Sequence, residues 1–97
     1  MQSDPYIFME VAVQHDRGGA TAAIIREGVD YRQKISLTDV ELDLGLKKLE
    51  TSGHINKRGD RYFVAESVVP SLPRTASGQL SFRRQDWDKL RQRHFGR

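Results

Sequence analysis

The 97-residue chain contains no cysteine, only one tryptophan and no long apolar run. Without thiols it can form neither disulfides nor thiolate metal sites, and it offers no cysteine nucleophile. No stretch reaches the roughly 18 apolar residues of a membrane span, and no charged segment precedes an apolar one as it would in a secretory signal. We therefore expect a cytoplasmic protein without a membrane partner.

The chain also lacks the residue patterns of common catalytic and cofactor sites. Its three histidines stand far apart, and no pair has the spacing of metal ligands on a helix. Neither a Gly-x-Ser-x-Gly motif nor a phosphate-binding glycine loop occurs. Asp39, Glu41 and Asp43 alternate along a predicted helix, so they point to different sides of it. We expect no enzyme, no cofactor and no metal.

What the chain does carry is charge of uneven sign. Residues 1–69 hold nine Lys/Arg and eleven Asp/Glu, a net charge of −2, whereas residues 70–97 hold seven Lys/Arg and two Asp, a net charge of +5. The overall +3 therefore belongs to the C-terminal part. At this length we expect one domain, residues 1–69, followed by a linker and a basic helix in residues 70–97.

Start signals and apolar spacing predict the helices of the domain. Asp4-Pro5 opens a helix over residues 6–14, although β-branched and aromatic residues leave a strand possible there. A loop over residues 15–19 precedes a short helix over residues 20–27, with Gly28 in the position that follows a helix end. The strongest helix lies within residues 36–52.

The third helix has both a start signal and a clear apolar stripe. Thr38-x-x-Glu41 is a capping box, in which each side chain bonds the other residue's amide. Leu42, Leu46 and Leu49 recur at helical spacing and predict the buried face.

The segments after the third helix predict a hairpin, a connection and a last helix. Residues 54–65 form a β-hairpin that turns at 57–60. Residues 69–81 are rich in serine and contain two prolines, as in a linker or an irregular surface strap. Residues 82–95 form an amphipathic helix with a narrow apolar stripe.

The order helix, short helix, long helix and hairpin over residues 4–65 resembles the winged helix-turn-helix superfamily, above all its small bacterial members. The resemblance rests on Leu42-x3-Leu46-x2-Leu49-x3-Gly53-His54-Ile55, followed by Gly59-Asp60-Arg61-Tyr62-Phe63-Val64. It implies an α+β, mainly α fold of three helices and a β-hairpin wing, to which this chain adds a C-terminal helix. In such domains the third helix enters the major groove and the wing touches phosphates.

The resemblance and the basic residues together suggest a DNA-associated protein that regulates transcription and binds double-stranded DNA, as a dimer. The candidate phosphate contacts are Lys47 and Lys48 on the third helix, Lys57, Arg58 and Arg61 on the wing, and Arg83, Arg84, Arg91 and Arg93 in the extension. Simpler interpretations stay open: the wing as a solvated turn, and the extension as a solvated helix or an arm that docks on the acidic body of a second copy.

The outer face of the third helix suggests an alternative. It presents Val40 and Leu44 among carboxylates, which repel phosphates. Either the C-terminal helix folds back and covers this face with Trp87 and Leu90, or a partner chain covers it. The alternative function is therefore protein interaction, as a homodimer or with another protein, through Val40, Leu44, Trp87 and Leu90 and without sequence-specific DNA binding.

Overall fold

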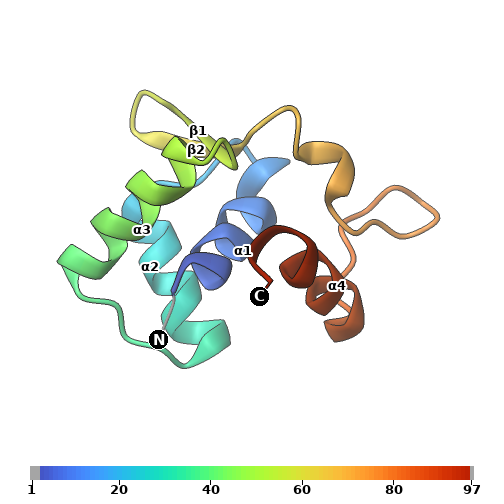
Figure 1. The fold of residues 1–97 in the computed structure, drawn as a ribbon, viewed down its shortest axis with the longest axis horizontal. Helices are drawn as coiled ribbons and strands as arrows, with labels where there is room; N and C mark the ends of the chain where they lie inside the picture. The colour runs from blue at the N-terminus through green and yellow to red at the C-terminus, as the bar shows by residue number, and fades with distance from the viewer. Residues whose placement is uncertain (1–2, 97) are drawn as a thin grey trace.

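The computed structural model describes residues 3–96 and shows an α+β, mainly helical fold (Figure 1). In chain order the elements are α1 (Asp4–His15), α2 (Ala22–Gly28), the π-helical turn η1 (Val29–Gln33), α3 (Asp39–Thr51), β1 (Ile55–Arg58), β2 (Arg61–Val64), the 3-10 turn η2 (Val69–Ser71) and α4 (Arg84–Phe95). α1 runs through the middle of the molecule, with α2 and α3 on one side and α4 on the other. The predicted class and the added C-terminal helix are confirmed.

α1 forms the centre of the core. Ile7, Phe8 and Val11 have no exposed surface. The strand that the sequence left possible over residues 6–14 is wrong, because these residues all belong to the helix. His15 is the last residue of this helix and not part of the following loop. Against α1 packs the predicted leucine stripe of α3, and Gly45 lets the two helices approach closely, since an added Cβ would collide with the Ile7 side chain.

The start of α3 follows the predicted capping box. The Thr38 hydroxyl accepts from the Glu41 amide at 3.1 Å, and the Glu41 carboxylate accepts from the Thr38 amide at 2.9 Å. Thr38 is the N-cap, so the helix begins at Asp39, three residues after the predicted segment opens.

The hairpin turns more tightly than the sequence suggests. Its register pairs Ile55 with Val64 and Arg58 with Arg61, so only Gly59 and Asp60 lie in the turn. Gly59 has a φ of +62°, and a two-residue hairpin turn with glycine first accepts this conformation readily. The predicted turn over residues 57–60 is therefore too long, because its first two residues belong to β1.

The hairpin is tied to the helices by a one-residue third strand. Ala20 and Tyr62 exchange both backbone hydrogen bonds, at 3.0 and 2.8 Å. Ala20 therefore precedes α2, which begins at Ala22. The predicted start of this helix at residue 20 is wrong.

The end of α2 differs from the prediction for a physical reason. Gly28 is the last residue of α2, has a φ of −65° and leads directly into η1, so it does not stand in the left-handed position that follows a helix end. A Cβ at this position would collide with the carboxylate of Glu10, which is 1% exposed. Glycine is required here because α1 places a buried carboxylate against α2.

Glu10 is held by one arginine. Both of its oxygens accept from Arg32 Nε at 3.2 Å, which joins α1 to η1. Burial raises the pKa of Glu10 above its ordinary value of 4.5, and this effect outweighs the lowering by the Arg32 charge. Because the folded state binds the proton more tightly, this carboxyl group favours the folded state at low pH and opposes it as the pH rises through its folded pKa.

Replacing Arg32 with methionine is expected to lower the free energy of unfolding by about 1–3 kcal/mol near neutral pH, since a buried carboxylate loses its donor. The loss should shrink as the pH falls towards 4, because the Glu10 carboxyl group takes up a proton and then no longer needs a charged donor. Urea denaturation followed by Trp87 fluorescence at both pH values measures this difference. Arg17→Met, at an exposed arginine, is the control, and an equal loss at both pH values would contradict the role given to Arg32.

Candidate interaction surfaces

The outer face of α3 is uncovered in the described part of the chain. Val40 is 66% and Leu44 is 57% exposed, whereas the leucine stripe faces α1. The predicted covering by the C-terminal helix is wrong: Trp87 and Leu90 are only 7% and 6% exposed and belong to the chain's own core. They pack beside α1, on the side away from α3, so they are not exposed for a partner.

The charges of α3 change along its length. The first half presents the carboxylates of Asp39, Glu41 and Asp43, and the second half presents Lys47, Lys48 and the carboxylate of Glu50. Asp39 pairs with Arg26 of α2, and Lys48 pairs with Asp4 of α1 at 2.9 Å. Of the two lysines predicted to meet phosphates, one is thus engaged in an ion pair at the base of α1.

The wing (residues 55–64) exposes all three of its predicted basic residues. Lys57 Nζ lies 5.5 Å from the centre of the Tyr62 ring, and the Arg58 guanidinium lies 4.9 Å from that of Phe63. Arg61 donates to the backbone oxygen of Gly19 at 3.4 Å. No carboxylate of residues 3–96 forms an ion pair with any of the three. The wing is the one predicted contact region whose positive charge is fully retained.

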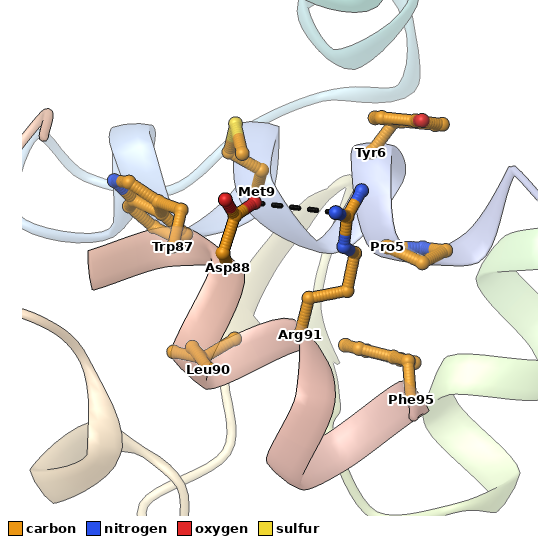
Figure 2. A pocket seen from close by; sticks show the side chains of 8 residues that line it. All are labelled: Pro5, Tyr6, Met9, Trp87, Asp88, Leu90, Arg91 and Phe95. Atoms are coloured by element: carbon orange, nitrogen blue, oxygen red, sulfur yellow. Dashed lines mark hydrogen bonds and ion pairs between the residues drawn. The ribbon is translucent and has the colours of Figure 1, made fainter. Parts of the chain in front are cut away.

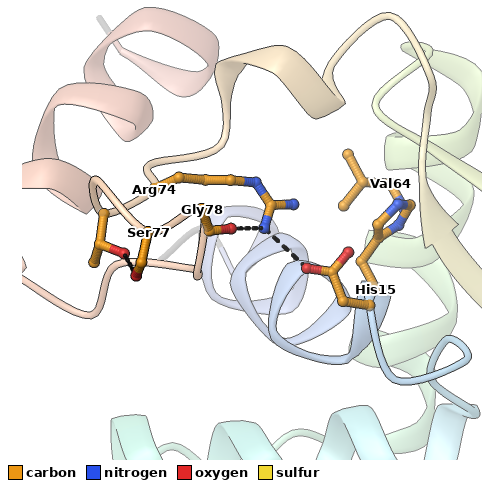
Figure 3. A network of polar contacts seen from close by, with 7 residues as sticks. His15, Val64, Arg74, Ser77 and Gly78 are labelled. Atoms are coloured by element: carbon orange, nitrogen blue, oxygen red, sulfur yellow. Dashed lines mark hydrogen bonds and ion pairs between the residues drawn. The ribbon is translucent and has the colours of Figure 1, made fainter.

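A strap (residues 65–83) carries the chain from the wing to the far side of α1. Arg74 donates to Asp16 at 2.9 Å and to the Gly78 oxygen at 3.1 Å, which fastens the strap to the end of α1 (Figure 3). Nearby, His15 Nδ1 accepts from the Val64 amide at 3.1 Å. The segment expected as a linker or an irregular surface strap, residues 69–81, lies within this strap and is packed on the body, with Leu72 and Ser81 buried.

α4 docks on α1 through its apolar stripe. Trp87 Nε1 donates to the Ser81 oxygen at 2.7 Å, which fixes the indole ring. Figure 2 shows α4 facing Pro5, Tyr6 and Met9 across a small pocket, with the ion pair between Asp88 and Arg91 beside it. The end of the strap and the start of α4 are therefore held against the body.

Docking also changes the charge that the extension offers. Arg83 pairs with Asp86 at 3.5 Å, and Arg91 pairs with Asp88 at 3.2 Å, so half of the predicted tail arginines face carboxylates on their own helix. Arg84 and Arg93 are exposed. The start of α4 lies across α1 from α3 (Figure 1), whereas the end of α4 approaches α3, since His94 and Phe95 line one pocket with Lys48. Arg97 lies outside the described residues.

The end of α4 packs in an aromatic cluster that the sequence did not reveal. The rings of His54 and Phe95 stack with centroids 5.0 Å apart, and His94 stands edge-on to His54 at 5.3 Å. Phe8 completes the cluster at 5.6 Å from Phe95. Forty residues separate the two histidines, and no spacing rule joins them. The only sequence signal was that each stands beside the end of an element.

Both histidines are harder to protonate than in water. Burial lowers the pKa of His54 and of His94 below 6.5, and neighbouring positive charge adds to this, from His94 and from Arg93 respectively. Their contribution to stability is therefore present above pH 6.5 and is lost as the pH falls through the folded pKa values.

The described residues contain neither a metal-binding cluster nor a membrane-spanning helix. Residues 3–96 hold no cluster of three or more His, Asp or Glu side chains that could bind a metal ion. Among these residues there is also no helix with the length and apolar character that crossing a bilayer requires. Comparisons with models of protein families, with curated proteins and with solved structures found no match.

Acidification is expected to destabilise the aromatic cluster. The urea midpoint of the parent chain should fall between about pH 7.5 and pH 5.5, and His94→Leu should reduce that fall because one of the two titrating rings is gone. Gln92→Leu, at an exposed non-titrating position of α4, is the control. The same fall in the parent chain and in the His94 variant would show that this histidine is not protonated more readily on unfolding.

Proposed function

We propose that this chain is a winged-helix domain that forms a homodimer through the outer face of α3, and that it acts by protein interaction. The observation that carries the proposal is the exposure of Val40 and Leu44 on that face. Large apolar side chains gathered on one side of a helix are typical of a contact surface. The order of three helices and a hairpin, with Ala20 as a short third strand, supports the winged-helix assignment.

The charge order of α3 favours a second copy as the partner. When two α3 helices cross antiparallel about a twofold axis at Leu44, that residue meets its own counterpart. The same symmetry sets position 41 of one copy opposite position 47 of the other, a glutamate opposite a lysine. The acidic first half of each helix then faces the half of its neighbour that carries both lysines and Glu50, so the lysines lie opposite carboxylates.

The same residues argue against reading of base sequence by α3. A helix in the major groove usually offers arginine, lysine, asparagine or glutamine to the base edges. Along α3 the exposed carboxylates outnumber the two lysines. Carboxylates close to phosphates are repelled, whereas in an antiparallel pair they meet lysines.

Leu44→Glu is expected to weaken the dimer by on the order of tenfold or more, because it introduces two like charges at the twofold axis. Lys47→Glu should weaken it less, by removing an attraction at the edge. Sedimentation equilibrium over a range of concentrations measures both effects, with circular dichroism to check folding. Gln85→Glu, which adds the same charge on exposed α4, is the control. A parent chain that is monomeric at every concentration would refute the proposal.

Binding to the phosphates of double-stranded DNA is a second candidate function, and the wing supports it. Lys57 and Arg58 extend over the rings of Tyr62 and Phe63, which hold their charges at the surface. Such an exposed basic hairpin suits the DNA backbone, whose contacts carry no sequence information. If the protein regulates transcription, its DNA site would then be selected by a partner protein or by the shape of the DNA, because backbone contacts do not read the bases.

The double variant Lys57→Ala/Arg58→Ala is expected to weaken duplex binding and to reduce the slope of log affinity against log salt by about 2, one for each lost phosphate contact. Fluorescence anisotropy with a labelled duplex at several salt concentrations gives both quantities. Lys34→Ala removes an exposed cation outside the wing and should change neither. The candidate fails if the parent chain does not bind duplex DNA even at low salt.

A further inference from the structure

A groove opens between η1 and the start of α4, on the side of the molecule away from α3. Its volume is about 360 Å³, within the usual range of small-molecule sites. Three arginines and three aromatic side chains line it: Arg32, Arg84, Arg91, Tyr6, Phe82 and Trp87. Figure 2 shows part of this region, with Tyr6 on α1 opposite Trp87 and Arg91 on α4.

The arginines retain hydrogen-bonding capacity towards the groove. Arg32 uses only Nε to hold Glu10, and its two terminal nitrogens have no protein acceptor among the described residues. Arg84 has no ion-pair partner within residues 3–96, and Arg91 bonds Asp88 through one nitrogen. Asp88 is the only carboxylate that lines the groove, so its lining carries a formal excess of positive charge. Planar guanidinium groups that line one groove can donate hydrogen bonds to the oxygens of a phosphate.

The aromatic side chains supply a second kind of contact. Phe82 is 66% exposed although it is large and apolar, and it lies immediately before the arginines that start α4. Trp87 is fixed from behind by its bond to Ser81, so its ring is part of a rigid wall. A planar base can stack on an exposed aromatic ring, and such stacking accepts any base because every base has a π-face.

We propose that this groove binds a nucleotide, with the phosphate at the arginines and the base on Phe82. A nucleotide carries a phosphate anion and a flat aromatic base in one molecule. These two groups match the arginines and the aromatic side chains that line the groove. The same unit occurs free in solution and in single-stranded nucleic acid. A duplex hides its bases within the stack, so it does not offer this combination.

The single tryptophan makes the proposal directly measurable, since Trp87 lies in the groove wall. Adenosine monophosphate is expected to change its fluorescence and to bind at least about tenfold more tightly than adenosine or inorganic phosphate, because only the nucleotide makes both contacts. A single-stranded oligonucleotide tests the second source. Tighter binding of the strand than of the mononucleotide assigns the site to nucleic acid, and equal binding assigns it to free nucleotides.

Variants separate the two halves of the site. Arg84→Ala should weaken nucleotide binding by about tenfold, as expected for one charged hydrogen-bond partner. Phe82→Ala should bring the affinity for the nucleotide down to that for phosphate, and Phe82→Tyr should restore it. Lys89→Ala removes a cation from the same helix outside the groove and should leave binding unchanged.

Three results would overturn the proposal. The first is no fluorescence change and no heat of binding in calorimetry with any probe at low salt. The second is equal affinity for phosphate and nucleotide, which would leave Phe82 without a role. The third is an equal loss from Lys89→Ala and Arg84→Ala, which would indicate general attraction to positive charge.

Discussion

α1 must be covered on more than one side, and the rest of the structure depends on this constraint. Positions 7, 8 and 10–13 are all buried, so the helix has no wide solvent face over its second and third turns. A helix that is apolar nearly all round is stable only when other elements surround it. α2, α3 and the wing cover one side, and the strap and α4 cover the other (Figure 1). The apolar side of the basic extension is thus part of the core. Trp87 and Leu90 are buried there and are not exposed for contact with a partner protein.

A charged residue buried in such a helix needs a hydrogen-bond partner. Glu10 of α1 determines how the end of α2 and the turn η1 pack against this helix. Its carboxylate takes the space of a side chain at Gly28, and its oxygens accept from Arg32. The chain continues from α2 directly into η1, and this turn brings Arg32 within hydrogen-bonding distance of Glu10. π-helical turns often mark functional sites, and here the turn also brings Arg32 to the edge of the groove beside α4. The buried ion pair and the proposed nucleotide site therefore share one guanidinium.

The division of charge acquires a structural meaning from these contacts. The basic extension neutralises part of itself through Arg83–Asp86 and Arg91–Asp88, and only its C-terminal end approaches α3. Each surface consequently has its own chemistry: the outer face of α3 is apolar with charges of both signs, the wing is basic, and the η1–α4 groove joins arginines to aromatic rings. A homodimer through α3 would leave the groove, on the other side of α1, exposed on each copy.

The local features could be predicted from the sequence because neighbouring residues determine them. The capping box at Thr38, the stripe of Leu42, Leu46 and Leu49, and the place of Leu44 on the opposite face of α3 follow from hydrogen bonding and helical period alone. The role of Gly28, the pairing of Glu10 with Arg32, the meeting of His54 with His94 and the docking of Trp87 join residues far apart in the chain. Only the tertiary structure decided these, because the side of α1 that α4 covers depends on the path of the strap, and no local pattern encodes that path.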